Sequence, residues 1–429
     1  MIQRYLSFLL LFVTISSAET MQHLITYGLK HSPMIQASKA QTELSKLSRE
    51  ASKAAQYGEL NLVGDYTHYN IERTLAPLPP SAMMSGTPIT TSKDIFTLGL
   101  NYAVPLFTGG AQTRQIEIDQ IATVMAEGSL KLTKAQLIYN IRTLYLSILS
   151  LQEILYAQRI HTSTLKKLER QIAKEVTVGR KASIEQYKSQ ADVAASKTQE
   201  EILSANIQIT KATLGALVGK SVRTVSPLKF SVKKPRYSTK RLLKKVSGLT
   251  KLKLEYLQTQ KAQKMIQKAQ AASMPQVSLN AYAGRNFGED IKTDEWDSED
   301  IWQIGIKGQY NLVDFGKRAI NEEKARVAML QARIHLQQVT LDVKKQLLQA
   351  LQKIKLSYAE YRGNNAQYRL SKKSAQIEKV RYESGASTIN DLLLAESKVQ
   401  FARAKVIQSR YDYKKNQYYL DYILEKGIQ

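Results

Sequence analysis

The sequence repeats itself at a constant spacing of 206 residues. Asp94–Leu100 (DIFTLGL) matches Asp300–Ile306 (DIWQIGI), and the same spacing places Gly110 on Gly316, Gly179 on Gly385 and Leu214 on Leu420 without a gap. A repeat on this scale indicates a duplicated structural unit, which outweighs the domain count that the length of 429 residues alone would suggest. Each copy shows two short amphipathic strands followed by very long helices.

The repeat divides the chain into four parts. Residues 1–18 have the basic, apolar and small-residue regions of a signal peptide cut after Ala18. Repeat 1 is predicted at 19–220 and repeat 2 at 240–429, joined by a segment at 221–239 that contains two prolines. The helical patterns that open the repeats, at 20–56 and 240–272, align at a spacing of 217. Repeat 1 therefore carries eleven extra residues between its strands, in an exposed loop expected at 70–94.

Each repeat contains a predicted β-hairpin, at 60–106 and at 277–312. Phe96, Leu98 and Leu100 share one face of a strand, while Thr97 and Asn101 share the other, and the counterpart strand alternates in the same way. Such alternation is typical of strands that cross an outer membrane with lipid on one side and water on the other. A soluble sheet with its apolar face on a core is the alternative, although four strands are few for so helical a chain.

Four strands are too few to close a barrel, because the smallest membrane barrels have about eight. An open sheet edge in the hydrocarbon layer would leave backbone groups without hydrogen bonds, at a cost of several kcal/mol each. If these strands lie in lipid, several chains must therefore share one barrel.

Long helices are predicted at 111–177 and 180–218 in repeat 1 and at 317–383 and 386–424 in repeat 2. A helix of the first length would measure roughly 100 Å. Pro105 is expected to end the strand ladder because it lacks an N–H, and Gly109, Gly110 and Gly316 are expected to turn the backbone from strand into helix. Glycines between the paired helices, Gly179 and Gly385, indicate turns that join antiparallel helices.

The composition argues against several classes of protein. The chain has no cysteine, and its five histidines show no metal-ligand spacing. Because phosphate loops, nucleophile elbows and plausible triads are also missing, neither an enzyme nor a cofactor is expected. The net charge of +25 raises the question of nucleic acid, but the lysines are spread along helices with few aromatic platforms for bases, so nucleic acid is not an expected partner.

With these parts in place, the mature chain resembles the TolC-type outer-membrane efflux and export channels. The resemblance is carried by the strand-to-helix element PLFTGG at 105–110 and by YESG at 382–385, followed by DLL at 391–393 and Ala395-Glu396. It implies a mainly α fold with a small β part: a trimer with a shared twelve-stranded barrel in outer-membrane lipid and a periplasmic coiled-coil tunnel. The segment 221–239 would belong to an equatorial belt around that tunnel.

The resemblance also implies partners and sites. A periplasmic adaptor would dock on the turns, here Val178, Gly179 and Arg180 with Ser384, Gly385 and Ala386, and an inner-membrane transporter would supply the energy. The periplasmic aperture would be gated by Glu185, Tyr382 and Asp391, with Tyr382 expected to hydrogen-bond Glu185. Two positions depart from the family pattern: Leu394 replaces a second carboxylate and Ser387 replaces an arginine.

Simpler interpretations remain beside these. Asp391 follows a turn and begins a helix, where a carboxylate is stabilised by ~0.3–1 kcal/mol whatever the function. The acidic residues at 289–300 are typical of a solvated loop, although they could also bind divalent ions. The predicted function is a passive exit duct of a tripartite efflux pump or type I secretion system. The alternative is a secreted, basic coiled-coil protein of structural or adaptor type without a pore.

Overall fold

A computed structural model describes residues 18–84 and 89–427, which separate into two compact units. One unit comprises Met1–Lys39, Ser129–Leu252 and Val339–Gln429, and the other comprises Ala40–Gly128 and Lys253–Gln338. Both repeats contribute to each unit. The predicted signal peptide falls, except for Ala18, outside the described residues. Among the described helices, none is long and apolar enough to cross a membrane.

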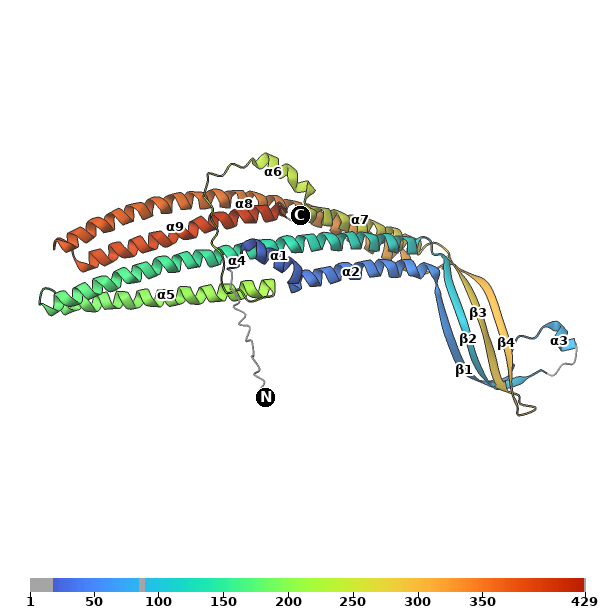
Figure 1. Ribbon diagram of the computed structural model, residues 1–429. Helices are drawn as coiled ribbons and strands as arrows, with labels where there is room; N and C mark the ends of the chain where they lie inside the picture. Colours follow the sequence, from blue (N-terminus) through green and yellow to red (C-terminus); the bar gives the residue numbers. More distant parts are fainter. Residues whose placement is uncertain (1–17, 85–88, 428–429) are drawn as a thin grey trace, which may run out of the picture. The chain divides into compact units, whose positions relative to one another are not determined.

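Two antiparallel helix pairs dominate the first unit (Figure 1). The longer helices are α4 (Ala111–Thr177) and α8 (Lys317–Glu383), each of 67 residues, with the bounds predicted from the sequence. Their shorter partners are α5 (Ser183–Val218) and α9 (Ile389–Ile423). Both partners begin three residues later than predicted, because the residues after each glycine complete the turn and the helix cap.

The second unit contains one antiparallel sheet in the order β1-β2-β3-β4. The strands are β1 (Glu59–Thr74), β2 (Thr91–Phe107), β3 (Gln276–Glu289) and β4 (Trp296–Gln309). Pairing carries one row across all four strands, from Leu62 through Leu100 and Ala283 to Trp302. The next row, Asn61, Asn101, Tyr282 and Gln303, lies on the opposite face. The predicted alternation is therefore confirmed.

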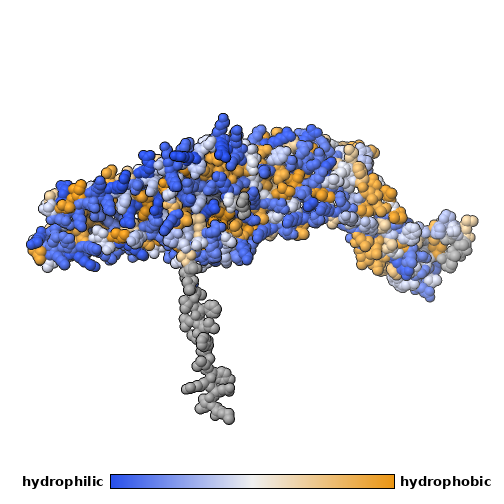
Figure 2. Space-filling model, turned by 45° about the horizontal axis from the view of Figure 1, so that its top comes forward, coloured by the Kyte–Doolittle hydropathy of each residue, from blue (hydrophilic) through white to orange (hydrophobic). Residues whose placement is uncertain are grey.

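The apolar face of the sheet is not packed against a protein core. Leu62 is 72% exposed, Trp302 78% and Ile306 71%. Figure 2 shows the apolar side chains gathered over the strands. Contiguous apolar surface of this kind marks contact with lipid or with another protein, so the soluble-sheet alternative loses its main premise.

Three local predictions were wrong. The loop in the first hairpin spans 75–90, not 70–94, because both strands extend further, and it contains the short helix α3 (Pro80–Met84). Pro105 does not end the ladder. Although it has no backbone N–H to donate, β2 continues through a bulge between Pro105 and Phe107 and pairs again at Phe107. The opening helix of repeat 1 is broken at Ser32, which is extended because it precedes Pro33.

That break yields α1 (Met21–His31) and α2 (Pro33–Ala54), with a 3₁₀ turn, η1 (Ala55–Tyr57), before β1. Repeat 2 is interrupted in the same region. Its opening helix is divided into α6 (Thr239–Lys245), η2 (Val246–Gly248) and α7 (Thr250–Ala271).

An extended segment at 219–238, here called the strap, links the repeats in the first unit. Its apolar residues, among them Val225, Leu228 and Phe230, pack against the helix core. The hydroxyl of Tyr145 donates to the carbonyl of Ser226 at 2.6 Å, and that of Tyr413 donates to the carbonyl of Lys233 at 2.7 Å. Two buried tyrosines thus hold the strap against α4 and α9.

Candidate functional site at the hairpin tips

The two helix hairpins end in the same turn. In repeat 1, the amide of Arg180 donates to the carbonyl of Glu175 at 2.8 Å, and that of Gly179 donates to Val176 at 3.0 Å. In repeat 2, the amide of Ala386 donates to Arg381 and that of Gly385 donates to Tyr382, at 2.8 and 3.1 Å. This is the Schellman pattern of a helix C-terminus.

The pattern requires a left-handed residue, and Gly179 and Gly385 have φ of +73° and +77°. The predicted turn residues Val178, Arg180, Ser384 and Ala386 are all exposed, as both glycines are. The tips therefore present two similar exposed turns, as a docking role would need.

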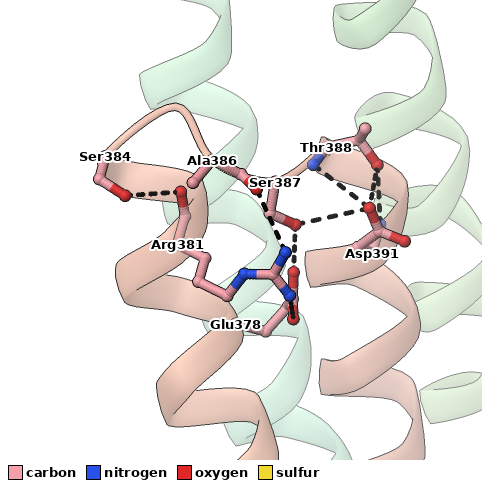
Figure 3. Close-up of polar contacts among 7 residues, drawn as sticks. All are labelled: Glu378, Arg381, Ser384, Ala386, Ser387, Thr388 and Asp391. Atoms are coloured by element: carbon pink, nitrogen blue, oxygen red, sulfur yellow. Dashed lines mark hydrogen bonds and ion pairs between the residues drawn. The ribbon is translucent and has the colours of Figure 1, made fainter.

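Asp391, the third residue of α9, forms a capping box with the N-cap residue Thr388 (Figure 3). The Thr388 hydroxyl accepts from the amide of Asp391 at 3.2 Å, while the Asp391 carboxylate accepts from the Thr388 hydroxyl and amide, at 2.7 and 3.3 Å. The hydrogen bond from the Thr388 side chain is the main reason that the pKa of Asp391 lies below its usual value. Asp391 is exposed and ionised, so it both caps the helix and places a negative charge at the tip.

Ser387 and Glu378 connect the two helices of the second hairpin. The Ser387 hydroxyl donates to Glu378, which also forms an ion pair with Arg381 at 3.2 Å. Arg381 in turn donates to the carbonyl of Ala386 at 3.3 Å (Figure 3). The position where the family pattern has an arginine thus carries a serine that stabilises its own turn.

Lys181, which no sequence pattern pointed to, joins the two hairpins through its ammonium group. It donates to the hydroxyl of Tyr382 and lies 3.8 Å from the centre of that ring. The same ammonium is 3.3 Å from a Glu175 oxygen and 3.4 Å from a Glu185 oxygen, and the side chain is only 19% exposed. Two residues after Gly179, Lys181 occupies the position that Ser387 occupies after Gly385.

These contacts shift the pKa values of Lys181 and Glu175. Burial alone would lower the pKa of Lys181, but its hydrogen bonds to Tyr382 and Glu175 outweigh burial and raise it. Burial would raise the pKa of Glu175, yet hydrogen bonds from Gln171 and Lys181 lower it. Both groups are therefore charged at neutral pH, and each stabilises the charged form of the other.

The expected hydrogen bond between Tyr382 and Glu185 is not formed within the chain, because Lys181 lies between them. Glu185 Oε2 is buried and has no hydrogen-bond partner among the described residues. That oxygen lies 3.4 Å from the Lys181 ammonium, so its contact within the chain is an ion pair and not a hydrogen bond.

Beneath the polar cluster, a small apolar core joins the hairpins of the two repeats. It consists of Leu165, Ile172, Tyr382, Ile389, Leu392 and Leu393. Ile172 is fully buried and Ile389 is 3% exposed. Within one chain, the two hairpin tips therefore form a single packed body.

At the other end of α4 and α8, each strand-to-helix junction has its own cap. In repeat 1, the Thr108 hydroxyl accepts from the amide of Gln112 at 3.3 Å; in repeat 2, Asp314 accepts from the amides of Gly316 and Arg318, at 3.2 and 2.9 Å. Gly109, Gly110 and Gly316 all have positive φ, as a turn from strand into helix requires. At Gly109, a Cβ would also lie 2.6 Å from the carbonyl oxygen of Ala271.

Within residues 18–84 and 89–427, no group of three or more His, Asp or Glu side chains is placed to hold a metal ion.

Solved structures with the same fold are outer-membrane proteins. VceC from Vibrio cholerae aligns with a TM-score of 0.79 at 18% identity, over 95% of this chain and 97% of that one. The CmeC outer membrane channel from Campylobacter jejuni aligns with a TM-score of 0.77 at 15% identity, over 95% and 86%. The MtrE outer membrane channel from Neisseria gonorrhoeae, solved in its open state, gives 0.76 at 16%, over 95% and 89%.

No curated protein sequence matches the chain significantly. The family model described as "Outer membrane efflux protein" matches residues 24–220 and 252–424, one segment in each repeat. Together these segments cover well over half of the chain, and they leave no support for a poreless structural protein. The chain belongs to the outer membrane efflux protein family, whose members are passive channels of the outer membrane and not enzymes.

Proposed function

We propose that three copies of this chain form the outer-membrane exit duct of a tripartite efflux pump or type I secretion system. Each copy contributes four strands to one twelve-stranded barrel and its long helices to one periplasmic tunnel. A periplasmic adaptor docks on the turns at 178–180 and 384–386, and an inner-membrane transporter supplies substrate. The segment 221–239 belongs to the equatorial region, and residues 1–18 act as the signal peptide.

This proposal rests mainly on the four-stranded sheet, which is open at both edges. Its apolar face is exposed, and β1 and β4 are its two edges. In lipid, each unpaired backbone group would cost several kcal/mol, so β4 of one protomer must pair with β1 of the next. Pairing through all three protomers closes the ring with no edge left.

The tips form the gate, with Glu185, Tyr382 and Asp391 around the aperture and Lys181 as the cation that ties them. The repeat supports a specific way of opening. Between repeats of one chain, Leu165 and Ile172 pack with Ile389 and Leu392. Shifted by 206 residues, the boundary between neighbouring protomers would place Ser371 and Glu378 of one against Ser183 and Gln186 of the next.

The first boundary is apolar and the second is polar. Separating the second exposes fewer apolar side chains, with Tyr187 in the place of Leu393, and water can replace the polar contacts that are lost. Each protomer's two hairpins therefore move together, and the gate opens between protomers.

The direct test of the duct is a planar-bilayer measurement on the purified full-length protein. A trimer that opens discrete conductances and stays in the membrane fraction after washing at high pH is expected. A monomer that washes off and conducts no current would overturn the proposal.

A further inference from the structure

More than half of the chain's net charge comes from one short region. Between residues 202 and 254 there are thirteen Lys or Arg residues and no Asp or Glu, in a chain whose net charge is +25. The region covers the end of α5, the strap, α6, η2 and the beginning of α7. The basic charge is therefore concentrated, and is not spread evenly along the helices as the sequence analysis assumed.

The strap holds its basic residues outward. Along it, Leu228, Phe230 and Val232 are partly buried and pack against the core, whereas Lys229, between the first two, and Lys233, after Val232, are exposed. All nine Lys and Arg from Arg223 to Lys245 are exposed; these nine residues are here called the basic belt. The buried hydrogen bonds from Tyr145 and Tyr413 fix the backbone beneath them.

The belt lacks internal counterions. Of the thirteen basic residues, Lys220 alone forms an ion pair with another described residue, Glu19, at 2.6 Å. Elsewhere in the chain, Lys181, Lys264 and Arg410 all pair with carboxylates. A row of like charges repels itself, so binding an external polyanion relieves that repulsion.

We propose that the basic belt binds the carboxylate-bearing peptides of the cell wall that surrounds the duct. This assignment rests on the proposed function, which places the strap in the periplasm. Five of the nine charges follow the extended strap and the other four lie on α6, and such a long row fits a polymer with repeated anionic groups better than one small anion. With three protomers, three belts would engage the same polymer, and each contact after the first would be intramolecular.

The aromatic residues of the strap argue against nucleic acid as the ligand. The strap has two aromatic residues, Phe230, which is partly buried against the core, and Tyr237, which is 42% exposed, so it does not offer the succession of open aromatic faces on which bases stack.

The belt is distinct from the adaptor turns. The strap is held at Tyr145, and α4 continues from there to Thr177 before the tip turn. These 32 residues of helix correspond to about 48 Å. Cell wall and adaptor could thus bind at the same time.

Co-sedimentation of the solubilised full-length trimer with purified, insoluble cell wall tests the proposal. The wild-type protein is expected to pellet at low salt and to stay in solution at high salt. The variant Lys233→Gln, Lys234→Gln, Lys244→Gln, Lys245→Gln should bind roughly tenfold more weakly. The matched control removes four lysines elsewhere, by Lys166→Gln, Lys167→Gln, Lys372→Gln and Lys373→Gln, and should bind as the wild type does.

Cell wall whose carboxylates have been converted to neutral amides should not bind. Equal binding to the amidated wall, or equal weakening by both quadruple variants, would overturn the proposal. So would tighter binding to phosphatidylglycerol vesicles or to a single-stranded oligonucleotide than to the wall. Trimer formation and conductance are measured on the same samples. If the wild type conducts but does not bind the wall, the belt proposal alone fails; if it does not conduct, the duct proposal fails.

Discussion

Lys181 in repeat 1 donates a hydrogen bond to the hydroxyl of Tyr382 in repeat 2 and places its charge 3.8 Å from the centre of that ring. The two residues are 201 positions apart, and the same ammonium also contacts Glu175 and Glu185. One side chain thus holds both hairpins of a protomer and neutralises two carboxylates that would otherwise repel each other.

We expect Lys181→Met to loosen the tips. Removing the cation from a largely buried cluster should cost about 1–3 kcal/mol locally, because two carboxylates lose their counterion. The measurable results are a larger closed-state conductance in planar bilayers and faster proteolysis of the turns. Lys188→Met, which removes an exposed lysine from α5, the helix that follows the turn of Lys181, is the control. Unchanged conductance in Lys181→Met would show that this contact does not hold the gate.

Asp391 can be tested separately as a charge and as a cap. Asp391→Asn keeps an oxygen that can accept from Thr388 but removes the negative charge, so it should reduce cation preference, read from the reversal potential in a salt gradient. Thr388→Ala removes the N-cap and should cost about 1 kcal/mol of helix stability with selectivity unchanged. If Asp391→Asn leaves the reversal potential unchanged, Asp391 serves only as a cap.

The charges of Glu175 and Lys181 predict that the closed gate is stable only between an acidic and an alkaline pH limit. The lowered pKa of Glu175 means that its stabilising effect is present above the ordinary carboxyl pKa of about 4.3 and is lost as pH falls through the lower, folded-state value. The raised pKa of Lys181 gives the opposite sign: its effect is complete below about 10.4 and is lost as pH rises through the higher, folded-state value. Closed-state conductance should stay low between these limits and rise below about pH 4. In Glu175→Gln, the acid rise should be flattened; an identical rise would assign it to other carboxylates.

Disulfide cross-links can distinguish the two boundaries at the tips, because the chain has no cysteine of its own. Ile172 and Leu392 both belong to the apolar core within one protomer. The double variant Ile172→Cys with Leu392→Cys should therefore export normally after its cysteines are oxidised. The repeat-related pair, Glu378→Cys with Gln186→Cys, should join neighbouring protomers into a covalent trimer and block export until a reductant is added. Export blocked by the first pair alone would mean that the gate opens within protomers.

Gly109 and Gly110 should respond differently to alanine. Both have positive φ, so each substitution carries strain of roughly 1–2 kcal/mol. A Cβ at Gly110 meets nothing within 4 Å, whereas at Gly109 it would lie 2.6 Å from the Ala271 carbonyl oxygen. Gly109→Ala should therefore lower the thermal unfolding temperature more than Gly110→Ala does. Equal losses would show that strain in φ, and not the contact with Ala271, controls this junction.

The parts of the fold that local sequence determines were predictable. Glycines that must adopt positive φ marked the ends of α4 and α8, and period-two alternation identified all four strands. The bounds of the first hairpin loop were wrong because ladder pairing, which depends on the partner strand, continues to Thr74 and resumes at Thr91. The break at Ser32-Pro33 had a local cause in the proline, but the apolar pattern across it resembled one helix.

The site residues also divide into those with a local sequence signal and those whose role depends on a distant part of the chain. Thr388 and Asp391 have the spacing of a capping box, and the cap interpretation of Asp391 is confirmed. Lys181 had no such local signal, because its role depends on Tyr382 in the other repeat. Comparing the repeats would have helped, since Lys181 and Ser387 occupy equivalent positions but only Lys181 carries a charge.

Joining two copies in one chain has a consequence for how such an assembly can evolve. In a ring of six separate, identical hairpins, every boundary would have the same sequence, so a change that tightened one would tighten all six. When the two copies are joined in one chain, the boundary within a protomer and the boundary between protomers are formed by different residues, so each can change without the other. The apolar contact of Ile172 with Leu392 could be strengthened while its counterpart, Glu378 with Gln186, remained polar. In a three-fold aperture built from such chains, the boundary within each protomer can be strong while the boundary between protomers stays weak.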